Sequence, residues 1–117
     1  MKMSVTNEQI VAVLEAFGLP VFYGEFDGDS VDDWNFFYYT DVRLEKPPGK
    51  VFQQTVVVYL VSRQRDVEKE MDVIEKLEAV KINFVGPAEY DRFKLADTDG
   101  YINVIAFPFT RLIKRSC

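Results

Sequence analysis

Apolar residues recur at helical spacing near the start of the chain. Positions 10, 13, 14 and 17 are apolar and fall on one face of a helix. Thr6 is followed three residues later by Gln9, a pairing that satisfies free backbone amides at a helix start. Gly18 can adopt the left-handed backbone that ends a helix, and Pro20 prevents the helix from resuming. This pattern predicts one short helix of about three turns.

A second helix is predicted over residues 66–80. Asp66 can accept hydrogen bonds from the free amides of the first turn, and acidic residues in that turn suit the helix dipole. Positions 67, 71, 74, 77 or 78, and 80 follow one side of this helix, and all of them except Glu78 are apolar. We expect that side to face the core.

The other apolar runs are typical of strands. The segment 51–62 is apolar on both faces near its centre, so we expect it to be the central strand and to be covered on both sides there. Pro108 lacks a backbone donor, which places part of the last strand at an edge or a bulge. Strands are predicted at 20–26, 34–42, 51–62, 89–97 and 101–113, with a short strand or extended link near 82–85.

The order of these elements is α-β-β-β-α-β-β. It predicts an α+β fold, a mixed, mainly antiparallel β-sheet with two helices packed on one face. At 117 residues, 48% of them hydrophobic, the chain has the length and the apolar content of one core. We therefore expect a single domain over residues 1–117.

The run WNFFYY at residues 34–39 places aromatic side chains on both faces of a strand. We interpret these rings first as core. Our second interpretation is an interface with a neighbouring subunit, because interfaces are enriched in aromatic residues. Stacking on single-stranded nucleic acid comes third, since the cationic groove it needs is missing nearby. Under the second interpretation Tyr39 is a candidate assembly contact on the less buried face of the strand.

The segment FDGDSVDD at residues 26–33 raises the question of a metal site. A calcium loop between helices needs oxygen ligands at its first, third and fifth positions, glycine at the sixth and glutamate at the twelfth. Asp27 and Asp29 match only the first two, and the flanking segments are strand-like. A non-standard site that adds Asp32 and Asp33 stays open, but aspartate, glycine and serine also favour turns. We expect a turn and no metal ion.

Two polar connections are expected outside the core, at residues 27–33 and 43–50. The second contains the sequence EKPPG, whose prolines and glycine cannot continue a central strand. Loops carried by a rigid sheet often serve recognition. With Tyr39, the candidate assembly contacts are Asp29, Asp32, Asp33, Lys46 and Lys50.

Composition argues against catalysis and against binding through nucleic-acid phosphates. The chain has no histidine, its single cysteine is Cys117, and its glycines form no phosphate-binding loop. Its formal net charge of -5 disfavours attraction to phosphates. No apolar run approaches the roughly 18 residues that would span a bilayer. We expect a soluble protein made in the cytoplasm, with no enzyme activity, no cofactor and no membrane association.

Several of these segments together resemble the small tail terminator, or tail completion, proteins of long-tailed bacteriophages. The resemblance extends over about residues 8–113. It rests on LEAFGLPVFYGEF, NFFYY, VVVYLVSRQRDVEKEMDVIEKLEA, EYDRF and GYINVIAFPFTRLI. The aspartate segment at 27–33 and the KPPG segment depart from the family pattern, so contacts assigned to those loops do not follow from it.

The resemblance implies an α+β subunit that assembles as a hexameric ring on the tail tube. Such a ring ends tail elongation and forms the tail side of the head-tail joint. The partners it implies are further copies of the chain, the tail tube protein and the head connector or stopper, with DNA passing through the ring without specific recognition. The expected location is the neck of the virion, after synthesis in the host bacterium. Two alternatives remain: another neck component, such as a stopper or adaptor, or a small acidic inhibitor of a host protein.

Overall fold

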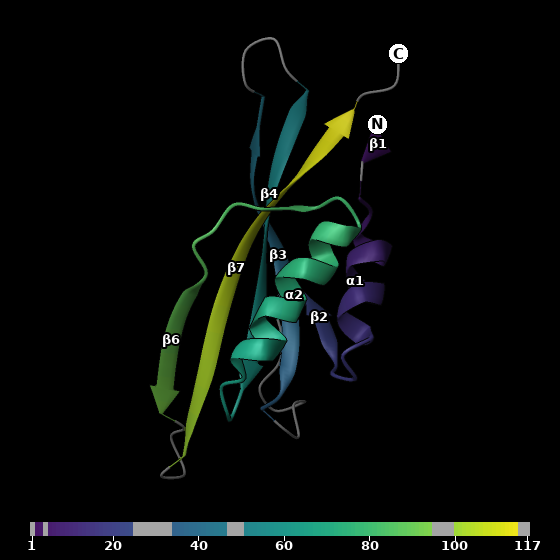
Figure 1. The fold of residues 1–117 in the computed structure, drawn as a ribbon. Coiled ribbons are helices and arrows are strands. Elements are labelled where there is room, and N and C mark those ends of the chain that lie inside the picture. Colours follow the sequence, from purple (N-terminus) through teal and green to yellow (C-terminus); the bar gives the residue numbers. More distant parts are fainter. Residues whose placement is uncertain (1, 4, 25–33, 47–50, 95–99, 115–117) are drawn as a thin grey trace.

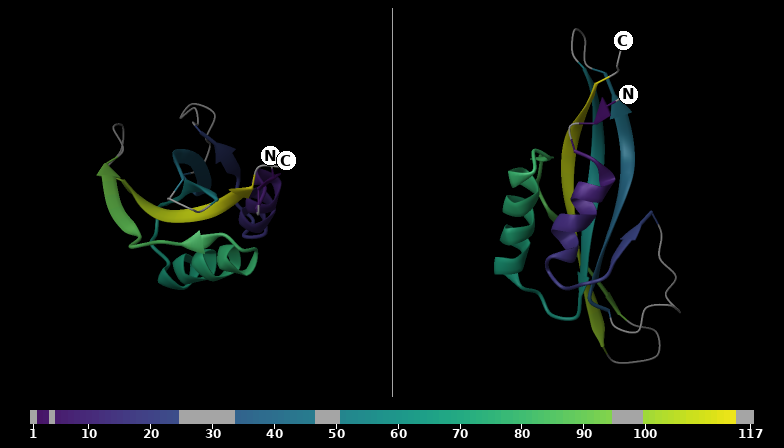
Figure 2. Two further views of the ribbon diagram at one scale, coloured as in Figure 1. Left: turned by 90° about the horizontal axis from the view of Figure 1, so that it is seen from above. Right: turned by 90° about the vertical axis from the view of Figure 1, so that its right-hand side faces the viewer.

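The computed structural model describes residues 2–3, 5–24, 34–46, 51–94 and 100–114. Within them the chain forms one curved sheet with two helices on one of its faces (Figures 1 and 2). The helices are α1 (Asn7–Glu15) and α2 (Val67–Ala79). The strands are β1 (Lys2–Met3), β2 (Val21–Tyr23), β3 (Phe36–Glu45), β4 (Phe52–Ser62), β5 (Asn83–Phe84), β6 (Glu89–Lys94) and β7 (Tyr101–Lys114). The predicted fold class is confirmed.

Strand β7 organises the sheet. It pairs with β4 along one edge, and its other edge is taken in turn by β1, β5 and β6. On the far side of β4 lies β3, and β2 follows it. The pairing of β2 with β3 is parallel, and the other pairings among the described strands are antiparallel. The mixed, mainly antiparallel sheet expected from the sequence is therefore present.

Helix α1 forms as its sequence predicts. The Thr6 hydroxyl accepts a hydrogen bond from the Gln9 amide at 3.2 Å, and the Gln9 side chain accepts one from the Thr6 amide at 2.8 Å. Ile10 and Leu14 are fully buried against the sheet. Gly18 has a φ angle of 82°, the left-handed conformation that glycine adopts readily after a helix.

Helix α2 begins at the predicted cap, and the predicted face is confirmed only in its second half. Leu77 is buried, and Ile74 and Val80 pack against the core. The Asp66 carboxylate accepts a hydrogen bond from the Lys69 amide at 3.1 Å. Val73 and Leu77 are fully buried, whereas Val67 and Met71 are about half exposed. The first residue of the buried face is Glu70, an acidic residue that a search for apolar periodicity could not select. Glu70 is buried because Arg65 donates hydrogen bonds to both of its carboxylate oxygens.

The main core lies between the helices and the sheet. Side chains alternate along the strands, and every second one enters this layer. The sheet supplies Phe37, Tyr39, Val56, Val58, Leu60, Ile105, Phe107 and Phe109. These residues pack against Ile10, Leu14, Val73 and Leu77 of the helices. Both faces of the sheet near Val57 were expected to be covered; Val56 and Val58 are fully buried on the helix side, and Val57 is only partly buried.

Three strand boundaries differ from those predicted. Strand β3 continues to Glu45, so residues 43–45, expected in a loop, pair with β4 after a register shift between Asp41 and Arg43. The shift inserts an extra residue, which keeps the hairpin paired although the alternation of apolar residues is lost. Strand β2 ends at Tyr23, before Gly24 with its φ of 78°. Strand β1 was not predicted, because two residues carry no periodic signal.

Pro108 lies where its missing donor breaks no bond to β4. Its carbonyl accepts a hydrogen bond from Val85 at 3.0 Å, on the edge of β7 that faces away from β4. In an extended strand the nitrogen and carbonyl of one residue point to the same side, so the proline nitrogen also faces this outer edge. Outer-edge pairing changes from β5 to β6 at this point. The predicted edge position of Pro108 is confirmed.

The molecule is elongated, with extents of 54 × 27 × 25 Å. Its radius of gyration is 15.3 Å, above the roughly 13 Å typical of a compact domain of this length. The cause is visible in Figure 1: β3 and β4 continue as a hairpin well past the helices. The end of the sheet opposite this hairpin is formed by the beginning of β7 and the end of β6.

Candidate assembly surface on the open face of the sheet

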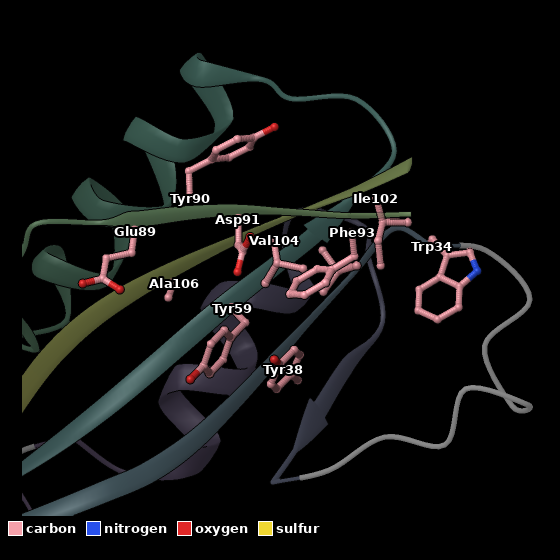
Figure 3. A pocket seen from close by; sticks show the side chains of 11 residues that line it. Trp34, Tyr38, Tyr59, Glu89, Tyr90, Asp91, Phe93, Ile102, Val104 and Ala106 are labelled. Carbon is pink, nitrogen blue, oxygen red and sulfur yellow. The ribbon is translucent and has the colours of Figure 1, made fainter. Parts of the chain in front are cut away.

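The face of the sheet opposite the helices carries a groove of about 420 Å³ (Figure 3). Strands β3, β4, β6 and β7 form its floor and sides. The lining residues are Trp34, Tyr38, Tyr59, Val61, Glu89, Tyr90, Asp91, Phe93, Ile102, Val104 and Ala106. We refer to this feature as the aromatic groove.

Strand register explains why the sheet is hollowed here. Tyr38 pairs with Tyr59, Tyr59 with Ala106, and Ala106 with Glu89, so these four residues form one row across four strands. Residues paired across strands point to the same face. Ala106 is the smallest member of the row and stands between a large ring and a long carboxylate side chain. The space above its methyl group is therefore open.

One wall of the groove is a stacked pair of tyrosines. The rings of Tyr38 and Tyr59 lie 4.3 Å apart with an interplanar angle of 8°. Burial raises the pKa of Tyr38 above its ordinary value of 10.0. Below this pair, Phe36, Val61 and Ile102 form a second apolar cluster, with Trp34 packed against it. The wall is thus well packed and predominantly apolar.

The opposite wall is acidic. Glu89 and Asp91 are exposed residues of β6 that line the groove, and the Phe93 side chain beside them is 49% exposed. Figure 3 shows the carboxylate of Asp91 on the side of the sheet that carries Tyr59, with Tyr90 pointing the other way. Aromatic faces beside carboxylates favour a partner that brings apolar and cationic groups together.

Tyr90 fastens β6 to the rest of the sheet from the helix side. Its hydroxyl donates a hydrogen bond to Asn103 Oδ1 at 2.6 Å, and the Arg65 guanidinium lies 4.5 Å from the centre of its ring. Arg65 is held in turn by Glu70 of α2. The position of the acidic wall therefore depends on contacts that reach the first turn of α2.

A second polar cluster lies where the hairpin leaves the body of the molecule. The Arg111 side chain is fully buried and donates hydrogen bonds to Gln54 Oε1 at 2.9 Å, the Val5 carbonyl at 3.0 Å and Asp41 Oδ1 at 3.2 Å. Asp41 also accepts a hydrogen bond from the Tyr23 hydroxyl at 2.8 Å. The cluster joins β2, β3, β4 and β7 to the segment before α1, which is a structural role.

The predicted contact residues fall into three groups. Tyr39 is 3% exposed and packs in the core beneath the helices, so its assignment to the less buried face is wrong. Strand alternation places Tyr38 on the open face instead, where it lines the aromatic groove. Lys46 is exposed at the end of β3, and its ammonium lies 5.3 Å from the centre of the Phe52 ring. Asp27, Asp29, Asp32, Asp33 and Lys50 lie outside the described residues.

Among the described residues, no group of three or more histidine, cysteine, aspartate or glutamate side chains could hold a metal ion. No helix in the described part of the chain is long and apolar enough to cross a membrane. Neither observation covers the aspartate segment at 27–33, because it lies outside the described residues.

Sequence reasoning did not select Tyr59, Glu89, Asp91, Phe93 or Ala106 as candidate contacts. Each of them lies in a segment predicted as a strand, but their meeting at one place depends on the register of β4, β7 and β6. The available signal was the alternation of Glu89, Asp91 and Phe93 on one face of their strand. Without the register, that alternation did not indicate a shared groove.

Comparisons with known proteins assign no family to this chain. No protein-family model matches this chain, and the comparison with curated proteins gives no match.

Proposed function

We propose that this protein is a structural subunit of a phage tail: a terminator that caps the tail tube as an oligomeric ring, ends tail elongation and forms the tail side of the head-tail joint. The observation that carries the proposal is the asymmetry of the sheet. One face is covered by two helices, and the other presents half-exposed aromatic residues in a groove. A subunit that acts by assembly needs such a surface.

Further support comes from the shape of the molecule and from its sequence. A paired hairpin extends well beyond the helices, so part of the sheet is available to neighbouring molecules. The sequence resembles tail terminator proteins over about residues 8–113, and the α+β sheet agrees with the fold that this resemblance implies. The net charge of -5 suits a ring through which DNA passes without specific binding.

The decisive experiment is electron microscopy of particles made by a phage from which the coding sequence has been deleted. We expect filled heads and separate tails, the tails being irregular or too long, and restoration of virions when the protein is supplied from a plasmid. Gold-labelled protein in the restored virions should lie at the neck. Tails of normal length that fail to join heads would indicate a different neck component. Infectious particles of normal appearance, with loss of a host-directed phenotype, would indicate the inhibitor.

A further inference from the structure

The aromatic groove and the β3–β4 hairpin lie at opposite ends of the molecule. The groove uses the beginnings of β3 and β7, whereas the hairpin is formed by the end of β3 and the beginning of β4. The long axis of the molecule is 54 Å, and β3 and β4 are paired from one region to the other. A hairpin held in this way cannot fold back into the groove of its own chain. Contact between the two must therefore join different molecules.

The hairpin carries the apolar and cationic groups that the groove favours. Val42 and Leu44 are 54% and 58% exposed, and Val51 is also exposed. Arg43 in β3 and Lys46 just after it are also exposed, with the exposed Glu45 between them. Arg43 pairs with Glu45 at 3.1 Å, but both side chains are more than half exposed, so this pair is readily exchanged for another.

The outer side of α2 is another exposed apolar surface among the described residues that could meet the groove. Its first turns expose Val67 and Met71. The same helix exposes Glu68, Asp72, Glu75 and Glu78 against Lys69 and Lys76, which leaves two more acidic than basic groups. Like charges brought together across an interface are unfavourable, so the acidic wall of the groove repels this helix. Charge therefore favours the hairpin over α2.

We infer that the aromatic groove of one copy receives the β3–β4 hairpin of a second copy. Val42 and Leu44 pack against the rings of the groove, and Arg43 and Lys46 meet Glu89 and Asp91. Because the two surfaces differ and lie at opposite ends, the contact is head-to-tail; it closes into a ring or extends as a filament, according to the rotation between neighbours. The inference deepens the proposed function by naming the contact between ring subunits.

A cross-linking experiment tests the contact directly. The photoreactive residue p-benzoylphenylalanine replaces Leu44, whose side chain is already exposed. The full-length protein is prepared unlabelled and labelled with ¹⁵N, and the two are mixed before irradiation. We expect mass spectrometry to find cross-links from position 44 to peptides of β6 or the beginning of β7, with the two isotopes combined. Cross-links confined to a single isotope, or to α2, would overturn the inference.

A charge exchange provides the second test, read by sedimentation of the purified protein over a range of concentrations. Reversing the hairpin charges with Arg43→Glu and Lys46→Glu should raise the dissociation constant for self-association about tenfold. Reversing the groove charges with Glu89→Lys and Asp91→Lys should have a similar effect, and mixing the two reversed proteins should restore assembly. The matched control, Glu68→Lys with Asp72→Lys on α2, should assemble like the wild type.

The outcomes separate this inference from the proposed function. A wild-type protein that stays monomeric at the highest soluble concentration overturns the inference, even if the deletion phage makes tails of abnormal length. Failure of the exchanged pair to restore assembly also overturns it. Conversely, a deletion phage with normal tails removes the proposed function, while the isotope-mixed cross-links would still establish the contact between copies.

Discussion

Arg111 of β7 donates a hydrogen bond to Asp41 of β3 across 3.2 Å, although these strands are separated by β4. The guanidinium is wholly inaccessible to solvent, and the Asp41 side chain is 23% exposed. Gln54 of β4 accepts a second bond from the same guanidinium. Burying a cation costs free energy unless the cation is paired and all its donors are hydrogen-bonded. The contacts of Arg111 therefore hold the three strands together where the hairpin begins.

Asp41→Asn should therefore destabilise the protein by about 3 kcal/mol, because it leaves the Arg111 charge buried without a counter-ion. Arg43→Gln is the matched control: it removes an exposed ion pair of similar length and should cost less than about 1 kcal/mol. Urea unfolding followed by circular dichroism measures both. Equal losses of unfolding free energy in the two variants would show that the buried pair stabilises the protein no more than the exposed pair does.

Stability should decrease at alkaline pH through three tyrosines. A hydrogen bond to Asp41 raises the pKa of Tyr23, and burial raises the pKa of Tyr38 and Tyr39. In each case the folded state holds the proton more tightly than the unfolded state does. The resulting stability is complete below the unfolded pKa of about 10 and is lost as the pH rises through the folded values.

Tyrosinate absorbance provides the measurement for this pH dependence. Some tyrosines of the native protein should ionise at a higher pH than they do in denaturant. Tyr23→Phe should remove one of the groups that ionise at the higher pH. Tyr101→Phe, at an exposed position, is the control. A native titration curve that coincides with that of the denatured chain would contradict the prediction.

Tyr39→Asp should unfold the protein instead of only separating its subunits. The substitution removes a ring from the core, which typically costs about 3–5 kcal/mol, and it places a carboxylate there as well. Leu44→Asp changes an exposed side chain and should leave the circular dichroism spectrum unchanged while weakening self-association. If Tyr39→Asp is soluble and folded, the packing of β3 beneath the helices is not as described.

Calcium should leave the stability of the protein unchanged. The aspartate spacing at residues 27–33 does not fit a calcium loop, and the described residues contain no metal-binding cluster. Thermal unfolding in excess chelator and in millimolar calcium should give equal midpoints, because a ligand of the folded state would raise stability by mass action. A higher midpoint in calcium would establish a site involving Asp27, Asp29, Asp32 or Asp33.

The sequence predicted the fold where local chemistry decides the structure. The Thr6 and Asp66 caps, the left-handed Gly18 after the end of α1 and the edge position of Pro108 each depend on neighbouring residues or on one backbone property. The extent of β3 was missed because residues 43–45 are polar or irregularly spaced, yet pairing with β4 holds them in a strand. Hairpin pairing overrode local propensity there.

The candidate surface was less accessible to prediction, because it depends on relations between distant segments. Alternation showed that Tyr38 and Tyr39 point to opposite faces, but not which face the helices cover. That choice follows from packing of the whole sheet, and it reversed the assignment of Tyr39. The groove at Ala106 likewise requires the register of four strands, which no single segment specifies.

The position of β7 has a consequence for how the chain folds as it is made. Strands β1, β4, β5 and β6 all pair with β7, and residues 52–62, which pair with β3 on one edge, pair on the other edge with residues 103–113. Such long sequence separations slow folding. Until β7 leaves the ribosome, the aromatic segment 34–39 and the apolar face of β4 are synthesised without the strand that completes the sheet. Transiently exposed apolar surface and unpaired strand edges are prone to aggregation, so we expect aggregation to be sensitive to changes in β7.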